Sequence, residues 1–146
     1  MGLFQSFNIS ASGMTAERFR TDIIAENIAN VNTTRTASGE PYRRKIVTFA
    51  EKQVTPFSQY YSHSKNAVVG NGVKVSKVTE DYENDFVMEY DPANPDADEN
   101  GYVAYPNVNT VTEMTNLIDA TRAYEANTTA FEASKKLAET GLTIGR

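Results

Sequence analysis

The clearest spacing of possible metal ligands lies in an acidic stretch, where Asp96, Asp98 and Asn100 alternate before a glycine. This is the pattern of the first half of a calcium-binding EF loop. The twelfth position of such a loop would be Asn107, which has no bidentate carboxylate, and the prolines in residues 91–95 exclude an incoming helix. We therefore expect an array of Asx turns that fixes the entry to the last helix. A calcium-responsive binding module is kept as an alternative.

The sequence offers few residues for catalysis or metal binding by histidine or cysteine. The chain has no cysteine, and its one histidine is His63, in a polar loop without a nucleophile elbow. A zinc site would therefore depend on carboxylates alone. Gly70-Asn-Gly72 precedes a strand pattern and lacks the lysine or helix start of a phosphate-binding loop. We predict no catalytic residue, no bound metal and no cofactor or small-molecule substrate.

The charge of the chain also excludes some partners. Its formal net charge is −5, whereas nucleic acid and anionic membranes select basic surfaces. The only basic run, Arg43 to Lys45, is interpreted as a solvated turn or strand edge, and charged helix residues such as Glu113 as solvated or as inter-helix pairs. No window approaches the roughly 20 apolar residues of a membrane span. The first ten residues do not have the pattern of a cleavable secretion signal.

Two long helical patterns lie at the ends of the chain. From Leu3 to about Val31, apolar and small residues recur at alternating intervals of three and four, which predicts a helix that ends among the asparagines and threonines of residues 27–34. The stretch 107–137 has the second pattern, roughly 45 Å of helix at 1.5 Å per residue. We expect Asn107 or Asn109 to cap it and Gly141 to end it.

Between the helices the period changes to two. Residues 42–50 and 73–78 alternate β-branched and polar side chains, which predicts two strands, and residues 81–90 can supply another. Residues 53–66 are expected to form an exposed loop. Residues 91–106 are rich in proline, asparagine and acidic groups, so we expect turns without regular structure.

The predicted fold class is therefore α+β, with the terminal helices packed as an antiparallel, coiled-coil-like pair and a small β-rich insertion between them. Residues 1–34 and 107–146 would form a helical polymerisation domain, and residues 35–106 the insertion. A two-helix pair leaves one side of each helix uncovered, so we expect an assembly subunit. The predicted assembly interface combines apolar stripe positions with helix asparagines: Phe4, Phe7, Met14, Ile24, Asn27, Ile28, Asn30, Val111, Met114, Leu117, Ile118, Tyr124, Asn127, Phe131 and Leu137.

Three segments resemble a known family. Residues 12–20 (SGMTAERFR) and 25–34 (AENIANVNTT) resemble the N-terminal signature of the axial proteins of the bacterial flagellum, which include rod, hook and hook-associated proteins. Residues 123–127 (AYEAN) resemble the signature of that family's last helix. Residues 91–109 resemble the hallmark segment of a member from the proximal rod. The match covers both ends and the junction before the last helix, and nothing is carried over for residues 53–69.

The resemblance implies a structural, non-enzymatic subunit of the basal-body rod. Such a subunit is exported by the flagellar type III apparatus without a cleavable signal and polymerises helically around the export channel, in the periplasm, as part of the drive shaft. Its partners would be its own copies, proximal and distal rod proteins, and the export gate and MS-ring adaptor region, without direct membrane insertion. Another axial component, such as a different rod segment or an adaptor, is the alternative within the same family.

Overall fold

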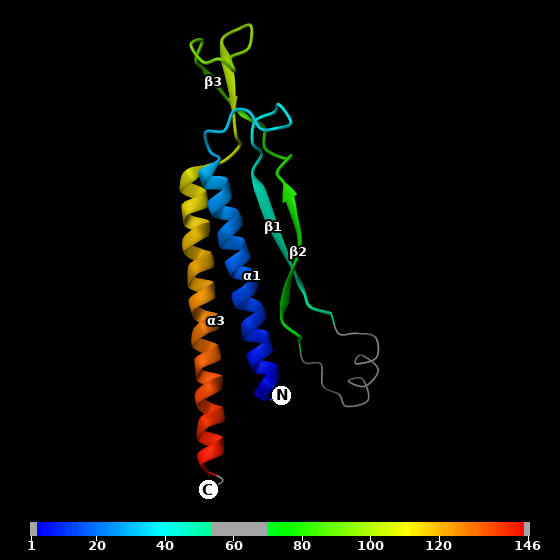
Figure 1. The fold of residues 1–146 in the computed structure, drawn as a ribbon, viewed down its shortest axis with the longest axis vertical. Coiled ribbons are helices and arrows are strands. Elements are labelled where there is room, and N and C mark those ends of the chain that lie inside the picture. Colours follow the sequence, from blue (N-terminus) through cyan, green and yellow to red (C-terminus); the bar gives the residue numbers. More distant parts are fainter. Residues whose placement is uncertain (1–2, 54–69, 145–146) are drawn as a thin grey trace. The chain divides into compact units, whose positions relative to one another are not determined.

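The computed structural model describes residues 3–53 and 70–144, and it has an α+β fold (Figure 1). Helix α1 spans Leu3–Ala29 and helix α3 spans Thr110–Ile144. Between them, the described residues form four strands: β1 (Lys45–Glu51), β2 (Val73–Glu80), β3 (Val87–Tyr90) and β4 (Tyr102–Tyr105). The strands form two separate two-stranded sheets, β1–β2 and β3–β4. The predicted fold class is therefore confirmed: the terminal helices pack together and the β insertion lies between them in sequence.

The chain divides into two compact units, and each unit combines sections of both helices with part of the β insertion. Unit 1 comprises Met1–Phe19, Phe49–Ser76 and Ala120–Arg146, and unit 2 comprises Arg20–Thr48 and Lys77–Asp119. Each long helix therefore contributes one section to each unit. The buried hydrophobic side chains are few and distributed along the chain, which agrees with the lean apolar composition.

Asparagine residues mark the end of α1 and the start of α3. After Ala29, the Asn30 backbone N–H donates to the Glu26 carbonyl at 3.1 Å, and the Asn30 side chain donates to the same carbonyl at 2.9 Å. The predicted end of α1 among residues 27–34 is therefore confirmed. At the start of α3, the Thr112 N–H donates to Asn109 Oδ1 at 3.1 Å, so Asn109 is the N-cap.

Gly141 does not end α3, so this prediction was wrong. The helix continues to Ile144, and Gly141 is not among the glycines with a positive φ angle. A glycine inside a helix costs only about 1 kcal/mol relative to alanine. Without a left-handed backbone at this residue, the C-cap geometry that would stop the helix is not formed.

In unit 1, sections of α1 and α3 pack in opposite directions. The ring centroids of Phe7 and Phe131 are 5.0 Å apart, and Gly13 lies against Asn127, so rising numbers on one helix meet falling numbers on the other. A Cβ atom on Gly13 would lie 2.5 Å from Asn127 Oδ1 and 2.8 Å from its Cγ. Asn127 is itself held, because its Nδ2 donates to the Ala123 carbonyl at 2.8 Å. The close approach of the helices at this point therefore requires a glycine.

We expect Gly13→Leu to lower the free energy of unfolding by about 1–3 kcal/mol, because the larger side chain must separate the helices or displace Asn127. Gly13→Ala should lower it less than Gly13→Leu, because the gain in helix propensity of about 1 kcal/mol offsets part of the cost of displacing Asn127. Urea unfolding monitored by circular dichroism measures both variants. Equal unfolding midpoints for the leucine variant and the wild type would show that the helices do not approach closely at this position.

Also in unit 1, Ser12 connects α1 to the start of β2. Its hydroxyl donates to the Ile9 carbonyl at 2.7 Å and accepts the Val73 N–H at 3.1 Å. Gly72, just before β2, has a φ angle of 91°, and a Cβ atom there would overlap Ser12 Oγ. Gly72 thus meets two requirements at once, a left-handed backbone and close contact with a helix. The β1–β2 sheet is thereby fixed to α1 near this end.

In unit 2, residues 91–106 are not free of regular structure, because they contain β4. Strands β3 and β4 pair antiparallel, with Val87 opposite Tyr105 and Tyr90 opposite Tyr102. Period-two alternation over four residues was too short to separate from the surrounding turns. The two tyrosine rings opposite each other, with centroids 5.3 Å apart, add a cross-strand contact.

The expected array of Asx turns is present between these strands. Side-chain oxygens of Asp91, Asn94 and Asp98 each accept a backbone N–H from the residue two positions later, at 3.2, 3.0 and 2.9 Å. Gly101, with a φ angle of 83°, completes the turn into β4. The acidic and amide groups of this segment therefore shape the backbone.

Candidate assembly surface and the polar junction behind it

A buried asparagine joins three elements of unit 2. Asn27, on α1, is 1% exposed. Its Nδ2 donates to the Lys45 carbonyl at 2.9 Å and to Glu113 Oε2 at 3.0 Å. Its Oδ1 accepts the Tyr42 hydroxyl and the Lys45 N–H, both at 2.9 Å. All four hydrogen-bonding positions of the amide are thus occupied, and they connect α1 to β1 and α3.

The second centre of this junction is Glu113, which is also 1% exposed. Its Oε1 accepts two hydrogen bonds from Arg44, at 2.9 Å from Nε and 2.7 Å from Nη2. The Arg44 side chain keeps 23% of its surface exposed and also lies 3.7 Å from an Asp81 carboxylate oxygen. A buried carboxylate is tolerated here because it is both paired with a cation and fully hydrogen-bonded. We call Asn27, Tyr42, Arg44, Lys45 and Glu113 the polar junction.

The sequence interpretation of two of these residues was wrong in part. Arg44 is not part of a purely solvated basic run, because it pairs with Glu113 and Asp81. Glu113 is not solvated, because it is 1% exposed and pairs with Arg44, the residue before β1, but the expected inter-helix pairing is present in its hydrogen bond from Asn27 on α1. The sequence carried no separate signal for the burial of Glu113, because a charged residue in a helical pattern is usually solvated.

Asp81 and Asn107 extend the junction toward β3. The Asn107 side chain accepts the Arg44 N–H at 2.9 Å and donates to the Asp81 and Asn84 carbonyls at 3.0 Å each. The Asp81 carboxylate accepts hydrogen bonds from the Asn84 side chain and from the backbone N–H groups of Glu83 and Asn84. Asn107 therefore does not cap α3, and instead ties its approach to the end of β2.

Two groups near the junction have shifted pKa values. The Asn84 side-chain hydrogen bond, the two backbone N–H groups and nearby Arg44 lower the pKa of the Asp81 carboxyl, although burial opposes them. Burial, then the negative charges of Glu26, Glu113 and Glu80, raise the pKa of the Tyr42 hydroxyl far above its usual value. The folded chain therefore favours ionised Asp81 and neutral Tyr42.

These shifts predict a stability plateau that is lost at both ends of the pH range. The Asp81 contribution is present above its unfolded pKa of about 4 and disappears as the pH falls through its lower folded value. The Tyr42 contribution is present below about pH 10 and disappears as the pH rises toward its higher folded value. Urea midpoints measured across this range test the prediction. Asp81→Asn should flatten the acid side and Tyr42→Phe the alkaline side, and unchanged slopes in both would contradict it.

Helix α3 presents two different faces in unit 2. Glu113 and Leu117, four residues apart, lie on the face that packs inward. Val111, Met114 and Ile118, at spacings of three and four, lie on the other side and are 74%, 52% and 54% exposed. We call these three residues the outward face. The apolar stripe seen in the sequence thus combines two helix faces, of which only one is covered by described residues of the chain.

The predicted interface residues fall into three groups by burial. Ile24 and Asn27 are buried within unit 2. The half-buried residues are Phe7, Met14, Ile28, Asn30, Leu117, Asn127 and Phe131. The exposed residues are Phe4, Val111, Met114, Ile118, Tyr124 and Leu137. The exposed apolar side chains are therefore available for contact with another chain. The buried and half-buried residues already contribute to the packing of this chain.

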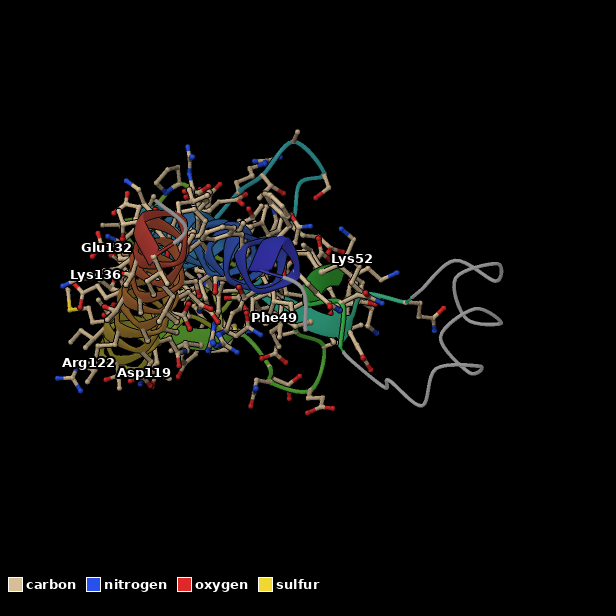
Figure 2. The ribbon with its side chains drawn as sticks, turned by 90° about the horizontal axis from the view of Figure 1, so that it is seen from below. Phe49, Lys52, Asp119, Arg122, Glu132 and Lys136 are labelled. Carbon is tan, nitrogen blue, oxygen red and sulfur yellow. The ribbon has the colours of Figure 1, made fainter. Side chains whose placement is uncertain are left out.

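Polar residues occupy the side of α3 that faces away from α1 in unit 1. Figure 2 shows Arg122, Glu132 and Lys136 pointing outward from this section of the helix, and all three are exposed. Exposed apolar residues lie nearer the end of the helix, where Leu142 and Ile144 are 77% and 80% exposed. Of the exposed apolar residues on α3, those of the outward face in unit 2 therefore form the denser cluster on one side of the helix.

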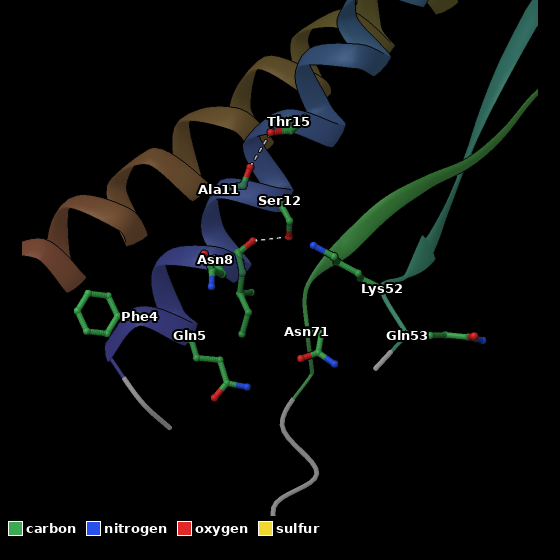
Figure 3. Close-up of a pocket in the computed structure, with 10 residues that line it drawn as sticks. Phe4, Gln5, Asn8, Ala11, Ser12, Thr15, Lys52, Gln53 and Asn71 are labelled. Atoms are coloured by element: carbon green, nitrogen blue, oxygen red, sulfur yellow. Dashed lines mark hydrogen bonds between the residues drawn. The ribbon is translucent and has the colours of Figure 1, made fainter. Parts of the chain in front are cut away.

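The main open groove of unit 1 has no catalytic arrangement. It lies between α1 and the ends of β1 and β2, and its walls combine apolar side chains such as Phe4 with amides, hydroxyls and a lysine, including Asn8, Thr15 and Lys52 (Figure 3). Among the described residues, no group of three histidine, cysteine or acidic side chains is placed to hold a metal. Asp96, the first residue of the calcium-like spacing, instead accepts the Thr34 hydroxyl at 2.8 Å. His63 lies outside the described residues.

Comparison with known proteins identifies the family. A model described as flagella basal body rod protein matches residues 7–35, and one described as the C-terminal part of flagellar basal body rod FlgEFG protein matches residues 99–144. The chain is 47% identical to the flagellar basal-body rod protein FlgC of Bacillus subtilis, over all of both chains. It is 43% identical to that of Borreliella burgdorferi, over 99% of this chain and 98% of the relative, and 38% identical to that of Escherichia coli O157:H7, over all of both.

These relatives extend along the whole chain, including the polar junction and the outward face. They favour a structural subunit over the calcium-responsive module. The chain belongs to the FlgC family of flagellar basal-body rod proteins and is a structural subunit of the basal-body rod.

Proposed function

We propose that this chain polymerises helically around the export channel, in the proximal part of the rod, and transmits torque as part of the drive shaft. The observation that carries the proposal is the outward face, where Val111, Met114 and Ile118 form an apolar cluster and each residue is more than half exposed. In this arrangement, residues 1–34 and 107–146 form the inner polymerisation domain and residues 35–106 lie outside it.

Burial of the outward face supplies part of the association energy. Complete burial of a valine, isoleucine or methionine side chain stabilises by about 1.5–3 kcal/mol, before the cost of immobilising the partner. The remaining exposed apolar residues, Phe4, Tyr124 and Leu137, extend the contact. Buried Ile24 and Asn27 act indirectly, because they hold the two helices in the arrangement that presents these side chains. An interface made from two different surfaces repeats head to tail, and it produces an open helical polymer when the rotation between copies does not close a ring.

The partners follow from this place in the rod. They are further copies of the chain, proximal and distal rod proteins, and the export gate and MS-ring adaptor region. The chain acts without enzymatic activity, cofactor, nucleic acid or direct membrane insertion, and it reaches the periplasm through the flagellar type III apparatus. In the part of the chain that the structure describes, no helix is long and apolar enough to cross a membrane.

A reconstruction of isolated basal bodies tests this function. We expect the chain in the proximal axial tube, with the outward face of α3 against a neighbouring chain. A position outside the axial tube would overturn the proposal. A position inside it, with Val111, Met114 and Ile118 facing solvent, would preserve the rod role and overturn the assigned contact.

A further inference from the structure

Charge is distributed unequally between the two units. Unit 2 holds six lysine and arginine residues against 14 acidic residues, a formal net charge of −8. The rest of the chain holds eight against five, a net charge of +3. Residues 78–121 contain 11 acidic residues and no lysine or arginine. The overall charge of −5 therefore conceals an acidic unit and a mildly basic one.

The same imbalance of charge between the units is present among exposed side chains. In unit 2, nine acidic residues are exposed (Asp22, Glu40, Glu80, Glu83, Asp85, Glu89, Asp98, Glu99 and Asp119), whereas Arg35 and Lys77 are its only exposed basic residues. Among the described residues of unit 1, six basic residues are exposed (Arg18, Lys52, Lys74, Arg122, Lys135 and Lys136) against four acidic ones. Ion pairing within unit 2 therefore leaves most of its surface charge uncompensated.

We propose that unit 2 of one copy contacts unit 1 of the next copy, so that the partner which covers Val111, Met114 and Ile118 is a unit 1 surface. This inference rests on the proposed polymerisation and names the segment that each neighbour contributes. The exposed apolar residues Phe4, Leu137 and Ile144 give unit 1 the nonpolar surface that such a contact needs.

Electrostatic repulsion excludes the alternative pairing of like units. A contact between two unit 2 surfaces would bring two strongly acidic surfaces within one Debye length, about 8 Å at physiological ionic strength. Like charges placed opposite each other at an interface oppose association and act as negative selection against that pairing. A contact between unit 2 and unit 1 brings opposite net charges together. It also joins different surfaces, so each added copy leaves the same two surfaces free.

Removing acidic charge from unit 2 should lower incorporation into the rod, whereas removing the same number of acidic charges from unit 1 should not. The unit 2 variant combines Glu83→Gln, Asp85→Asn and Glu89→Gln, and the matched unit 1 variant combines Glu125→Gln, Glu132→Gln and Glu139→Gln. Cells make each variant together with the wild-type chain, and the ratio of the two chains in isolated basal bodies is measured. We expect the unit 2 variant to be depleted about tenfold, from exposed charge pairs worth up to 1 kcal/mol each. The unit 1 variant should be incorporated equally or preferentially.

Equal or increased incorporation of the unit 2 variant would overturn this pairing, because removal of repulsion between like units predicts that result. Circular dichroism of both purified variants confirms that they fold. The proposed function itself fails separately, if the wild-type chain is absent from the axial tube. A wild-type chain in the tube together with a preferred unit 2 variant would therefore refute only the pairing.

The lack of native cysteines allows a second test. Thr115→Cys in unit 2 and Lys136→Cys, Glu132→Cys or Lys74→Cys in unit 1 are produced singly and combined in the same cells, and basal bodies are treated with a short bifunctional thiol reagent. We expect crosslinks between the unit 2 cysteine and at least one unit 1 position on another copy. Crosslinks only between two copies of Thr115→Cys, or none to the unit 1 positions, would overturn the inference.

Discussion

Replacing Glu113 with alanine is expected to lower the free energy of unfolding by about 3 kcal/mol, which corresponds to a loss of roughly 6–12 °C in melting temperature. The substitution leaves the Arg44 guanidinium without its main anion and an Asn27 N–H without an acceptor. Breaking a buried ion pair by removing one partner typically costs 3–5 kcal/mol. We expect the lower end of this range because Arg44 is 23% exposed and can turn toward water.

Urea denaturation of the purified chain measures this effect, and Glu125→Ala is its matched control. Glu125 lies on the same helix but is exposed, so its removal should change stability by at most about 0.5 kcal/mol. A double-mutant cycle of Glu113→Ala with Asn27→Ala should be strongly non-additive, since both residues belong to one network. Similar unfolding midpoints for the Glu113 and Glu125 variants would show that the polar junction does not stabilise the fold.

The combined substitution of Met114→Asp and Ile118→Asp is expected to abolish incorporation into the rod, and with it motility. It places two unpaired carboxylates in the contact that we assign to the outward face, where burial of even one isolated charge is strongly unfavourable. Both side chains are more than half exposed in the single chain, so the folded chain itself should lose little stability. Recovery of the chain in isolated basal bodies, together with swimming assays, gives the readout.

Ala37→Asp is a suitable control for this experiment, because it adds a carboxylate at an exposed loop residue of unit 2 away from the helices. It should be incorporated normally. If the double α3 variant also assembles normally, the outward face does not contact a neighbour, and the apolar surface that drives polymerisation must lie elsewhere.

Local rules were sufficient to predict the helices and the longer strands from the sequence. The asparagines after Ala29 and the cap at Asn109 compete for backbone hydrogen bonds in the way that ends or starts a helix. The strand at Val73–Glu80 has the β-branched alternation of a half-buried strand. These features depend on residues close together in the chain, which is why single-sequence reasoning finds them.

The polar junction could not be predicted in the same way, because its members come from distant positions. Asn27 and Glu113 are 86 residues apart, and Arg44 reaches Glu113 across 69 residues. A charged residue in a helical pattern is usually solvated, so only the tertiary structure reveals that Glu113 lies inside. For the same reason, the helical stripe of α3 could not be separated into an inward and an outward face before its packing partner was known.

Two asparagine side chains at the start of β1 have a further consequence for how this protein polymerises. Asn27 bonds both the N–H and the carbonyl of Lys45, as a residue of a neighbouring antiparallel strand would. Asn107 is inserted between the Arg44 N–H and the Asp81 carbonyl, next to the direct hydrogen bond from the Asp81 N–H to the Arg44 carbonyl. The Asn27 amide thus imitates a peptide unit and occupies the backbone groups of Lys45, where another chain would otherwise add by β-pairing. The Asn107 amide instead joins the residue before β1 to the residue after β2. A protein made in many copies thereby closes this unwanted route to aggregation and leaves side-chain contacts to direct its assembly.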